Sequence, residues 1–262
     1  MVPNTNIGRT YLFGYGSLLC SKSRGITCPE LSDRAAIPVM VNGLERTWSK
    51  RSAKLGMTAM GIRFREGSRC AGVLVPLASS KELELFDHRE QGYQRHRLDL
   101  ESIEKIDFLP EEKYEEHDEF IQVLAQTQED NSSLEGSSDE DSVSSLNELD
   151  IWVYVPEKTM APAKDFPIAQ SYVDTILRGC MDVGGEPLVE EFLTTTTGWH
   201  PEDWEDPHYA KSDRIASVWI NDRSDPVYTR GDPNHFRKHG RTFDKFLTEY
   251  ISDYLPLRVD PQ

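Results

Sequence analysis

Two short segments of the sequence carry groups that are suited to chemistry. The first is the run Leu12-Phe13-Gly14-Tyr15-Gly16-Ser17, which ends a β-prone stretch. Its two glycines can adopt positive φ angles, so successive backbone N–H groups of this turn are able to point at one anion. The run lacks the Gly-Lys-Ser/Thr of a phosphate-binding loop and the Gly-x-Ser-x-Gly of a hydrolase nucleophile. By itself it is also typical of a tight turn that binds nothing.

The second segment leads to Glu90. In a helix, Leu83, Phe86 and Glu90 share one face, because Phe86 and Glu90 follow Leu83 by three and seven residues. A carboxyl group on an apolar face, at the C-terminal end of a helix, has a raised pKa because burial and the helix dipole both disfavour its charge. Such a group is suited to acid–base catalysis near neutral pH. A structural salt bridge to Arg89 or Arg95 is the alternative role for this carboxylate.

The predicted elements place both segments at the end of a strand or helix. Ser79 and Glu82 form a capping-box pattern, which predicts the start of a helix that ends at Gly92. A strand over 93–100 follows, and we expect it to pair with the apolar, β-branched run 151–155. Four earlier strands are predicted over residues 9–15, 37–41, 58–64 and 71–77.

The second half of the chain changes to a helical period. Pro167 predicts the start of a helix over 168–181, Gly184 and Gly185 interrupt it, and a second helix is predicted over 187–193. Beyond Trp199 the chain is rich in Pro, Asp and aromatic residues, with a strand predicted over 215–221 and a last helix over 241–254.

The net charge of -16 is concentrated in one part of the chain. Residues 101–150 contain 17 Asp and Glu but only two Lys, whereas the rest of the chain has 28 acidic and 27 basic residues. The segment 117–150 is rich in Ser, Glu and Asp, and such a composition buries too little apolar surface to offset the entropy lost on ordering. We therefore predict a disordered acidic insertion between the strands 93–100 and 151–155.

Composition also excludes several classes of protein. With no excess of Lys and Arg outside the acidic insertion, we expect no nucleic-acid partner. No apolar run is long enough to cross a bilayer, and the first residues lack the pattern of a secretory signal, so we expect no membrane partner. The four cysteines are scattered without a C-x-x-C pair, which favours a reducing, cytoplasmic location over a disulfide scaffold.

Several motifs, taken in order, resemble the γ-glutamylcyclotransferase superfamily, which includes glutathione-degrading enzymes. The resemblance covers about residues 9–195 apart from the acidic insertion, and the combination is specific although each motif alone is not. The motifs are Leu-Phe-Gly-Tyr-Gly-Ser-Leu at 12–18, Gly-Leu-Glu-Arg at 43–46 with Trp48, Gly-Val-Leu at 72–74, Phe-Asp-His-Arg-Glu-Gln-Gly-Tyr-Gln-Arg at 86–95, the strand containing Tyr154, and Tyr172 seven residues before Gly179.

The resemblance implies an α+β fold, in which helices flank a small mixed β-barrel-like sheet. It also implies an enzyme that cyclises the γ-glutamyl group of a small-molecule donor to 5-oxoproline and releases an amine. By position, Glu90 matches the catalytic acid/base, the run Leu12, Phe13, Gly14, Tyr15, Gly16 and Ser17 matches the substrate-holding loop, and Tyr172 matches a tyrosine that contacts substrate. The reaction requires no metal ion and no organic cofactor.

Three questions stay open at this point. The domain implied by the resemblance spans 1–199, and residues 200–262 form an extension that is either a packed cover on the same domain or a specificity element near the pocket. The donor is glutathione, another γ-glutamyl amino acid or a γ-glutamylamine. The alternative function is a non-catalytic protein that binds anionic ligands on the same fold and uses the acidic insertion as an interaction arm.

Overall fold

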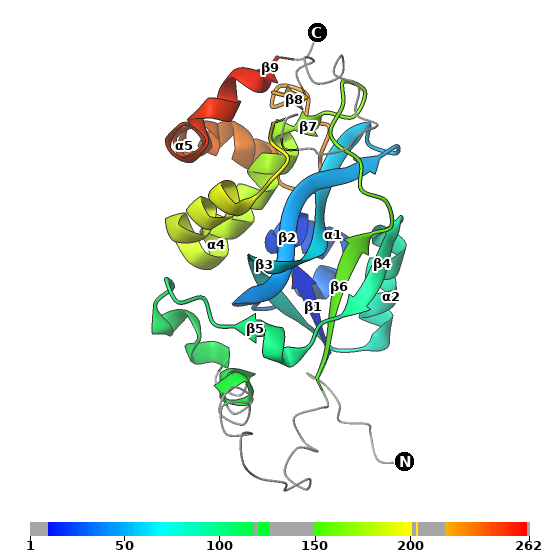
Figure 1. Cartoon of the computed structure of the whole chain (residues 1–262), viewed down its shortest axis with the longest axis vertical. Coiled ribbons are helices and arrows are strands. Elements are labelled where there is room, and N and C mark those ends of the chain that lie inside the picture. The colour runs from blue at the N-terminus through cyan, green and yellow to red at the C-terminus, as the bar shows by residue number, and fades with distance from the viewer. Residues whose placement is uncertain (1–9, 118–119, 126–148, 201–202, 204–217, 261–262) are drawn as a thin grey trace, which may run out of the picture.

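The computed structural model describes residues 10–117, 120–125, 149–200, 203 and 218–260, and its centre is a mixed β-sheet (Figure 1). The buried strand β1 (Thr10–Gly14) runs parallel to β6 (Asp150–Pro156) on one side and antiparallel to β3 (Met57–Leu77) on the other. β4 (Tyr93–Arg97) pairs with β6 in antiparallel register, which confirms the predicted pairing of these two runs.

The long antiparallel pair of β2 (Ile37–Ser52) and β3 forms the largest part of the sheet. β3 joins the two separate strands that were predicted over 58–64 and 71–77, and Gly67 with φ of 75° lies between them. The register between β2 and β3 shifts at Asn42/Leu44 and again at Trp48/Lys50. Such irregularities bend a strand pair, and they allow β3 to contact β1 near one end and β7 near the other. 

Helices cover both sides of the sheet: α4 and α5 lie together on one side and α2 lies on the other (Figure 1). α2 (Ser80–Arg89) begins as predicted, because the Ser79 hydroxyl accepts a hydrogen bond from the Glu82 N–H. Its apolar face buries Leu83 and Phe86. Gly92, with φ of 77°, turns the chain into β4, so the helix ends where the sequence predicted. The predicted α+β class, with a mixed sheet and flanking helices, is confirmed.

The helix α4 (Gln170–Thr195) contains the predicted interruption. Gly185 has φ of 68° and ψ of −157°, which only glycine adopts easily, and it separates two helical segments. The predicted start at 168 is wrong, because Ile168–Ala169 form the short strand β7. Backbone hydrogen bonds from Thr58 N to Pro167 O and from Ile168 N to Val218 O hold this segment between other strands, and such long-range pairing overrides the local helical preference.

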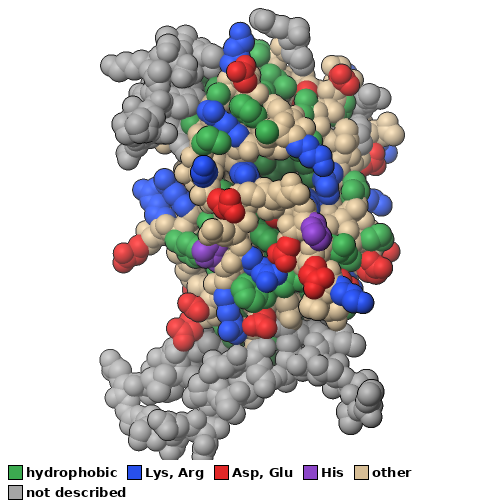
Figure 2. All heavy atoms as spheres, turned by 90° about the vertical axis from the view of Figure 1, so that its right-hand side faces the viewer, with side chains coloured by type: hydrophobic (Ala, Val, Ile, Leu, Met, Phe, Trp, Pro, Cys, Tyr) green, Lys and Arg blue, Asp and Glu red, His purple; other side chains and the backbone are tan. Residues whose placement is uncertain are grey.

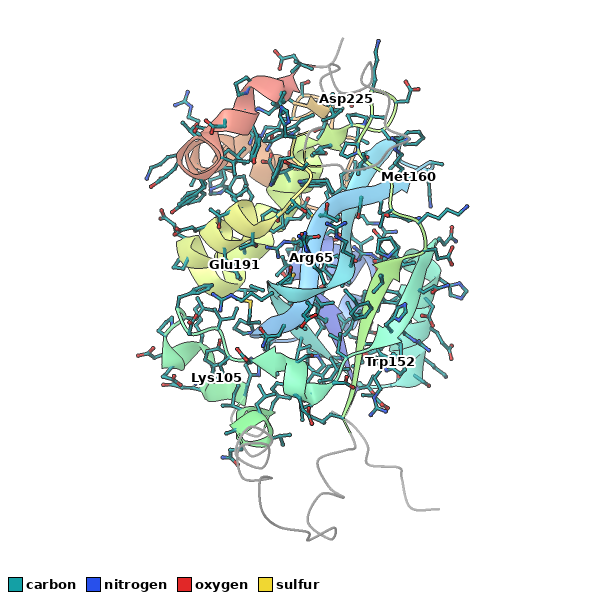
Figure 3. All side chains as sticks on the ribbon, in the orientation of Figure 1. Arg65, Lys105, Trp152, Met160, Glu191 and Asp225 are labelled. Carbon is teal, nitrogen blue, oxygen red and sulfur yellow. The ribbon has the colours of Figure 1, made fainter. Side chains whose placement is uncertain are left out.

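α4 is attached to β2 by a buried ion pair. Nη2 of Arg46 lies 3.0 Å from Oε2 of Glu191, and Nη1 of Arg46 also donates to the Ala71 carbonyl. Figure 3 labels Glu191 on α4, facing the sheet. Since breaking such a buried pair leaves an uncompensated charge, the pair holds α4 in one position on the sheet.

The described residues of the C-terminal extension form two short strands, an α-helix and a 3-10 helix (Ser252–Leu257). β8 (Trp219–Ile220) runs parallel to β7, and β9 (Arg258–Val259) runs parallel to β8. The helix α5 (Pro233–Tyr250) packs against α4, and it begins and ends earlier than the predicted 241–254. The extension is thus continuous with both the sheet and the helical layer.

Residues 120–125 correct one boundary of the predicted disordered insertion over 117–150. They are helical, with Phe120 and Leu124 buried, and the ring of Phe120 packs against Tyr11 at 5.0 Å between centroids. The prediction of disorder rested on the acidic composition of the whole segment and overlooked these two apolar side chains, which pack into the core of the folded chain. β5 (Ile103–Glu104), which pairs with β2, also precedes the insertion. Residues 126–148 lie outside the described residues.

The cysteines and the helices bear on two of the predictions made from composition. All four cysteines are buried free thiols. Among the helices that the structure describes, none combines the length and the apolar character needed to cross a membrane.

Candidate active site

Strand and helix ends meet around an open pocket that encloses about 310 Å³ of space, part of it open to solvent. The end of β1, the turn after it, the C-terminal end of α2 and the first turn of α4 all contribute side chains. The residues that line the pocket are Phe13, Tyr15, Gly16, Ser17, Leu18, Met60, Glu90, Tyr93, Tyr154 and Tyr172.

Glu90 is the acidic residue of this pocket lining. Its N–H bonds to the Phe86 carbonyl and closes the last turn of α2, so the carboxylate projects from the helix end. The side chain is 16% exposed, and Oε1 lies 2.9 Å from Nε of Arg89, whose side chain is only 6% exposed. Burial raises the pKa of Glu90, and the positive charge of Arg89 opposes this rise without cancelling it.

Arg89 forms hydrogen bonds to two other segments, the helix α1 (Ser21–Thr27) and the turn at Ser17. Its Nη1 donates to the Ser23 carbonyl at 2.8 Å and to Oγ1 of Thr27 at 3.0 Å. Its Nη2 donates to the hydroxyls of Ser17 and Ser23, each at 3.0 Å. Because all three nitrogens of the guanidinium have acceptors, Arg89 is a fixed charge beside Glu90. The predicted alternative, a salt bridge from Glu90, is therefore present with Arg89, whereas Arg95 pairs with Asp87.

The turn after β1 differs from the expected anion-binding loop with positive φ angles. Neither Gly14 nor Gly16 has a positive φ, and Gly16 instead precedes a short 3-10 helix, Ser17–Leu19. The N–H groups of Ser17 and Leu18 are in the first turn of this helix, where they have no partner within the helix. Gly16 packs closely on its neighbours, because a Cβ there would lie 3.1 Å from Cβ of Met60 and 3.2 Å from the Tyr172 hydroxyl.

Tyr172 lies in the first turn of α4, with its hydroxyl at the pocket. The hydroxyl accepts a hydrogen bond from Met60 N at 3.4 Å and bonds with the Ser17 side chain. The ring meets Trp48 edge-on at 5.9 Å and Tyr228 at 4.7 Å between centroids. Burial raises the pKa of Tyr172 further above that of an ordinary tyrosine, so its hydroxyl stays protonated and can donate a hydrogen bond to a ligand.

The remaining predicted residues divide between pocket and core. Phe13 and Tyr15 line the pocket, and the Tyr15 hydroxyl donates to the Tyr154 carbonyl at 2.6 Å. Leu12 is fully buried and is absent from the pocket lining, as is Gly14. Alternation along β1 explains this division for Leu12 and Phe13, because successive side chains point to opposite faces of a strand.

The sequence did not single out Leu18, Met60, Tyr93 or Tyr154 as residues of a site, yet all four line the pocket. The hydroxyl of Tyr93 donates to the Met60 carbonyl at 2.8 Å, and that of Tyr154 donates to Asp87 at 2.8 Å. These bonds fix the two rings beside Glu90. The position of Tyr93 just after the Gly92 turn was the one available signal, since a residue there returns past the end of the helix. Within the described part of the chain, no three His, Cys, Asp or Glu side chains gather as a metal site requires.

Comparisons with known proteins return structures only. No family model matches the chain, and no curated protein matches its sequence. A solved structure described as a γ-glutamyl cyclotransferase is similar at 13% identity and a TM-score of 0.42, over 66% of this chain and 79% of its own. An uncharacterized protein from Homo sapiens has 14% identity and a TM-score of 0.43, over 68% of this chain and 85% of its own. A γ-glutamyl cyclotransferase specific to glutathione from yeast has 12% identity and a TM-score of 0.32, over 70% and 86% of the two chains. Two of these three structures are described as γ-glutamyl cyclotransferases.

Proposed function

We propose that this protein is a cyclotransferase, which converts a γ-glutamyl peptide or amine to 5-oxoproline and releases the amine. Glu90 is the general acid/base of the reaction. The observation that carries the proposal is the meeting of Glu90, Ser17 and Tyr172 in one pocket, since these residues come from the two motifs and the helix that resemble the family.

The reaction needs one group that first accepts and then returns a proton. The α-ammonium of the donor loses a proton to the Glu90 carboxylate, and its nitrogen attacks the γ-carbonyl carbon. A C–N bond forms in the five-membered ring, the original amide C–N bond breaks, and Glu90 returns the proton to the leaving nitrogen. The attacking nitrogen gives up a second proton as it becomes the lactam N–H, and the released amine takes up a proton and leaves as an ammonium. A carboxyl with a raised pKa is suited to both transfers, because it is a stronger base than an ordinary glutamate and can still return the proton.

Binding in a bent conformation makes this intramolecular attack fast. In our proposal, the Ser17 and Leu18 N–H groups and the Tyr172 hydroxyl hold the α-carboxylate of the donor. The donor chain then folds so that its nitrogen lies close to its γ-carbonyl carbon. The aromatic walls that Phe13, Tyr93 and Tyr154 supply limit access of water to the reacting atoms.

The test is the formation of 5-oxoproline from purified protein. Glutathione, a panel of γ-glutamyl dipeptides and ε-(γ-glutamyl)-lysine are the donors, and Glu90→Gln is the matched variant. We expect 5-oxoproline from at least one donor with the natural chain, and a large loss with the variant. Binding of a γ-glutamyl compound with no 5-oxoproline from any donor would instead favour the non-catalytic, anionic-ligand-binding alternative.

A further inference from the structure

The C-terminal extension is anchored to α4 directly beside Tyr172. The buried carboxylate of Asp222 accepts hydrogen bonds from the N–H of Ser171 at 2.8 Å, the hydroxyl of Ser171 at 2.6 Å and the N–H of Val227 at 2.8 Å. The next residue, Arg223, donates through Nε and Nη2 to both oxygens of the fully buried Asp174, at 2.6 and 2.8 Å. Because all these groups are paired, the segment after β8 is held in one position on α4.

This anchor brings Tyr228 into contact with the pocket residues. The N–H of Tyr228 donates to the Ser171 hydroxyl at 3.0 Å, and its ring meets Tyr172 edge-on at 4.7 Å between centroids. Its hydroxyl lies 3.0 Å from Oγ of Ser23 and 3.5 Å from Nη2 of Arg89. The extension is therefore part of the wall that supports Tyr172 and Arg89.

Two residues further along, Arg230 adds a positive charge at the same place. Its Nη1 donates to Oγ1 of Thr27 at 3.0 Å, the same oxygen that accepts from Nη1 of Arg89 at 3.0 Å. Two guanidinium groups that share one acceptor repel each other, and Arg89 alone has the carboxylate of Glu90 as its close counter-ion. This juxtaposition places two positive charges next to each other beside Glu90.

Lys50 of β2 supplies a third cation that acts on Glu90. Its Nζ lies 5.3 Å from the centroid of the Tyr93 ring and against Gly92, where a Cβ would meet it at 2.2 Å. The charges of both Arg230 and Lys50 act on the Glu90 carboxyl and lower its pKa. Arg89, Arg230 and Lys50 lie outside the residues that line the pocket, and their three positive charges act on the one carboxylate of that lining. On the face that carries α2 and β4, Lys and Arg side chains border a hollow with an apolar floor (Figure 2).

We propose that Arg230 and Lys50 select γ-glutamyl donors whose leaving group carries a carboxylate, an inference that rests on the proposed function. The α-carboxylate and α-ammonium of any γ-glutamyl donor cancel in charge. A carboxylate on the leaving group is the additional negative charge that matches the excess of cations, and a guanidinium binds it with charge-assisted hydrogen bonds. A γ-glutamylamine whose released amine carries no carboxylate lacks this group and leaves the two cations without a counter-ion.

Two donors of equal size test this selection: γ-glutamyl-alanine and γ-glutamyl-alaninamide, which differ by one carboxylate. The measurement is the ratio of kcat/KM for the first donor to that for the second, which the folded fraction of a variant does not affect. We expect a ratio of about ten or more for the natural chain, a fall of about tenfold in Arg230→Gln or Lys50→Gln, and a largely retained ratio in Arg230→Lys. Lys54→Gln is the control, since it removes one positive charge from the exposed turn between β2 and β3.

The outcomes distinguish a failure of this inference from a failure of the proposed cyclotransferase function on which it rests. A ratio near one for the natural chain, or a ratio unchanged in both Arg230→Gln and Lys50→Gln, would overturn the selection while the cyclotransferase stands. An equal fall in Lys54→Gln would also overturn it, because net charge rather than position would then explain the preference. No 5-oxoproline from either of these donors or from the wider donor panel would overturn the proposed function, and this inference with it.

Discussion

Replacing Glu90 by Gln separates a catalytic role of this residue from a structural one. The change keeps the size of the side chain and an amide oxygen that accepts the hydrogen bond from Nε of Arg89, 2.9 Å away in the natural chain. It removes the negative charge and the ability to take a proton. The remaining donors of Arg89 keep their acceptors on Ser17, Ser23 and Thr27.

The effect on stability is the sum of two opposing contributions. Deleting one partner of a buried ion pair costs about 3–5 kcal/mol, but here the hydrogen bond persists and Glu90 is 16% exposed, so the cost is smaller. In the opposite direction, the raised pKa means that ionising Glu90 is less favourable in the folded chain than in the unfolded chain. As pH rises through the interval between the unfolded and the folded pKa, Glu90 therefore lowers stability, and the penalty is complete above the folded pKa. Glu90→Gln removes it, and we expect a net change within about 1 kcal/mol, or about 2–4 °C in Tm.

The effect on turnover is much larger. Without a group that accepts the ammonium proton, 5-oxoproline formation falls by about a hundredfold or more, equivalent to about 2.7 kcal/mol in the barrier. The natural chain loses kcat/KM as pH falls through the pKa of Glu90, and this acid limb lies above the usual range of a glutamate. In Arg230→Gln the limb moves to higher pH, because a charge that lowers this pKa is gone.

Thermal unfolding and 5-oxoproline release are measured on one preparation of each protein. Product release is normalised to the folded fraction, so that a loss of fold is not read as a loss of catalysis. A Glu90→Gln protein with a much lower Tm but normal turnover per folded molecule would refute the catalytic role. Glu90 would then be the structural partner of Arg89.

Three further perturbations test other parts of the structure. Tyr172→Phe should lower kcat/KM about tenfold with a Tm change of a few degrees. The hydroxyl bonds only to Met60 N and Ser17 among the described residues, and the ring packing stays. Unchanged kinetics would mean that Tyr172 is a core residue without a role in substrate binding. Replacing 126–148 with a Gly-Ser linker should preserve fold and turnover. A deletion extended to Phe120 should lower the unfolding free energy by about 3 kcal/mol or more, since Phe120 and Leu124 are buried. Equal urea midpoints for the two deletions would contradict this expectation. Asp222→Ala strands the N–H groups of Ser171 and Val227 and should cost about 2–4 kcal/mol in urea unfolding; a loss under about 1 kcal/mol would mean that the extension is not anchored there.

Local sequence signals predicted the elements that depend on nearest neighbours. The cap of α2 at Ser79, its end near Gly92 and the break of α4 at Gly185 each arise from a conformational preference of one residue or from a hydrogen bond within one turn. The predicted face of α2 was also right for Leu83 and Phe86, which are buried, because helical period alone decides which side chains share a face. The family motifs named Glu90, the Leu12–Ser17 run and Tyr172, and five of those residues line the pocket together with Glu90.

Tertiary structure decided everything that depends on residues distant in sequence. The fusion of two predicted strands into β3, the strand β7 in place of a helix start and the burial of Phe120 all follow from pairing or packing with distant segments. The charges around Glu90 are the clearest case: Arg230 and Arg89 meet at Thr27, although 141 residues separate the two arginines. Coulomb interactions depend on distance in space, so no pattern along the chain indicates which cation acts on Glu90, or that Tyr228 of the C-terminal extension contacts Tyr172 of the pocket lining.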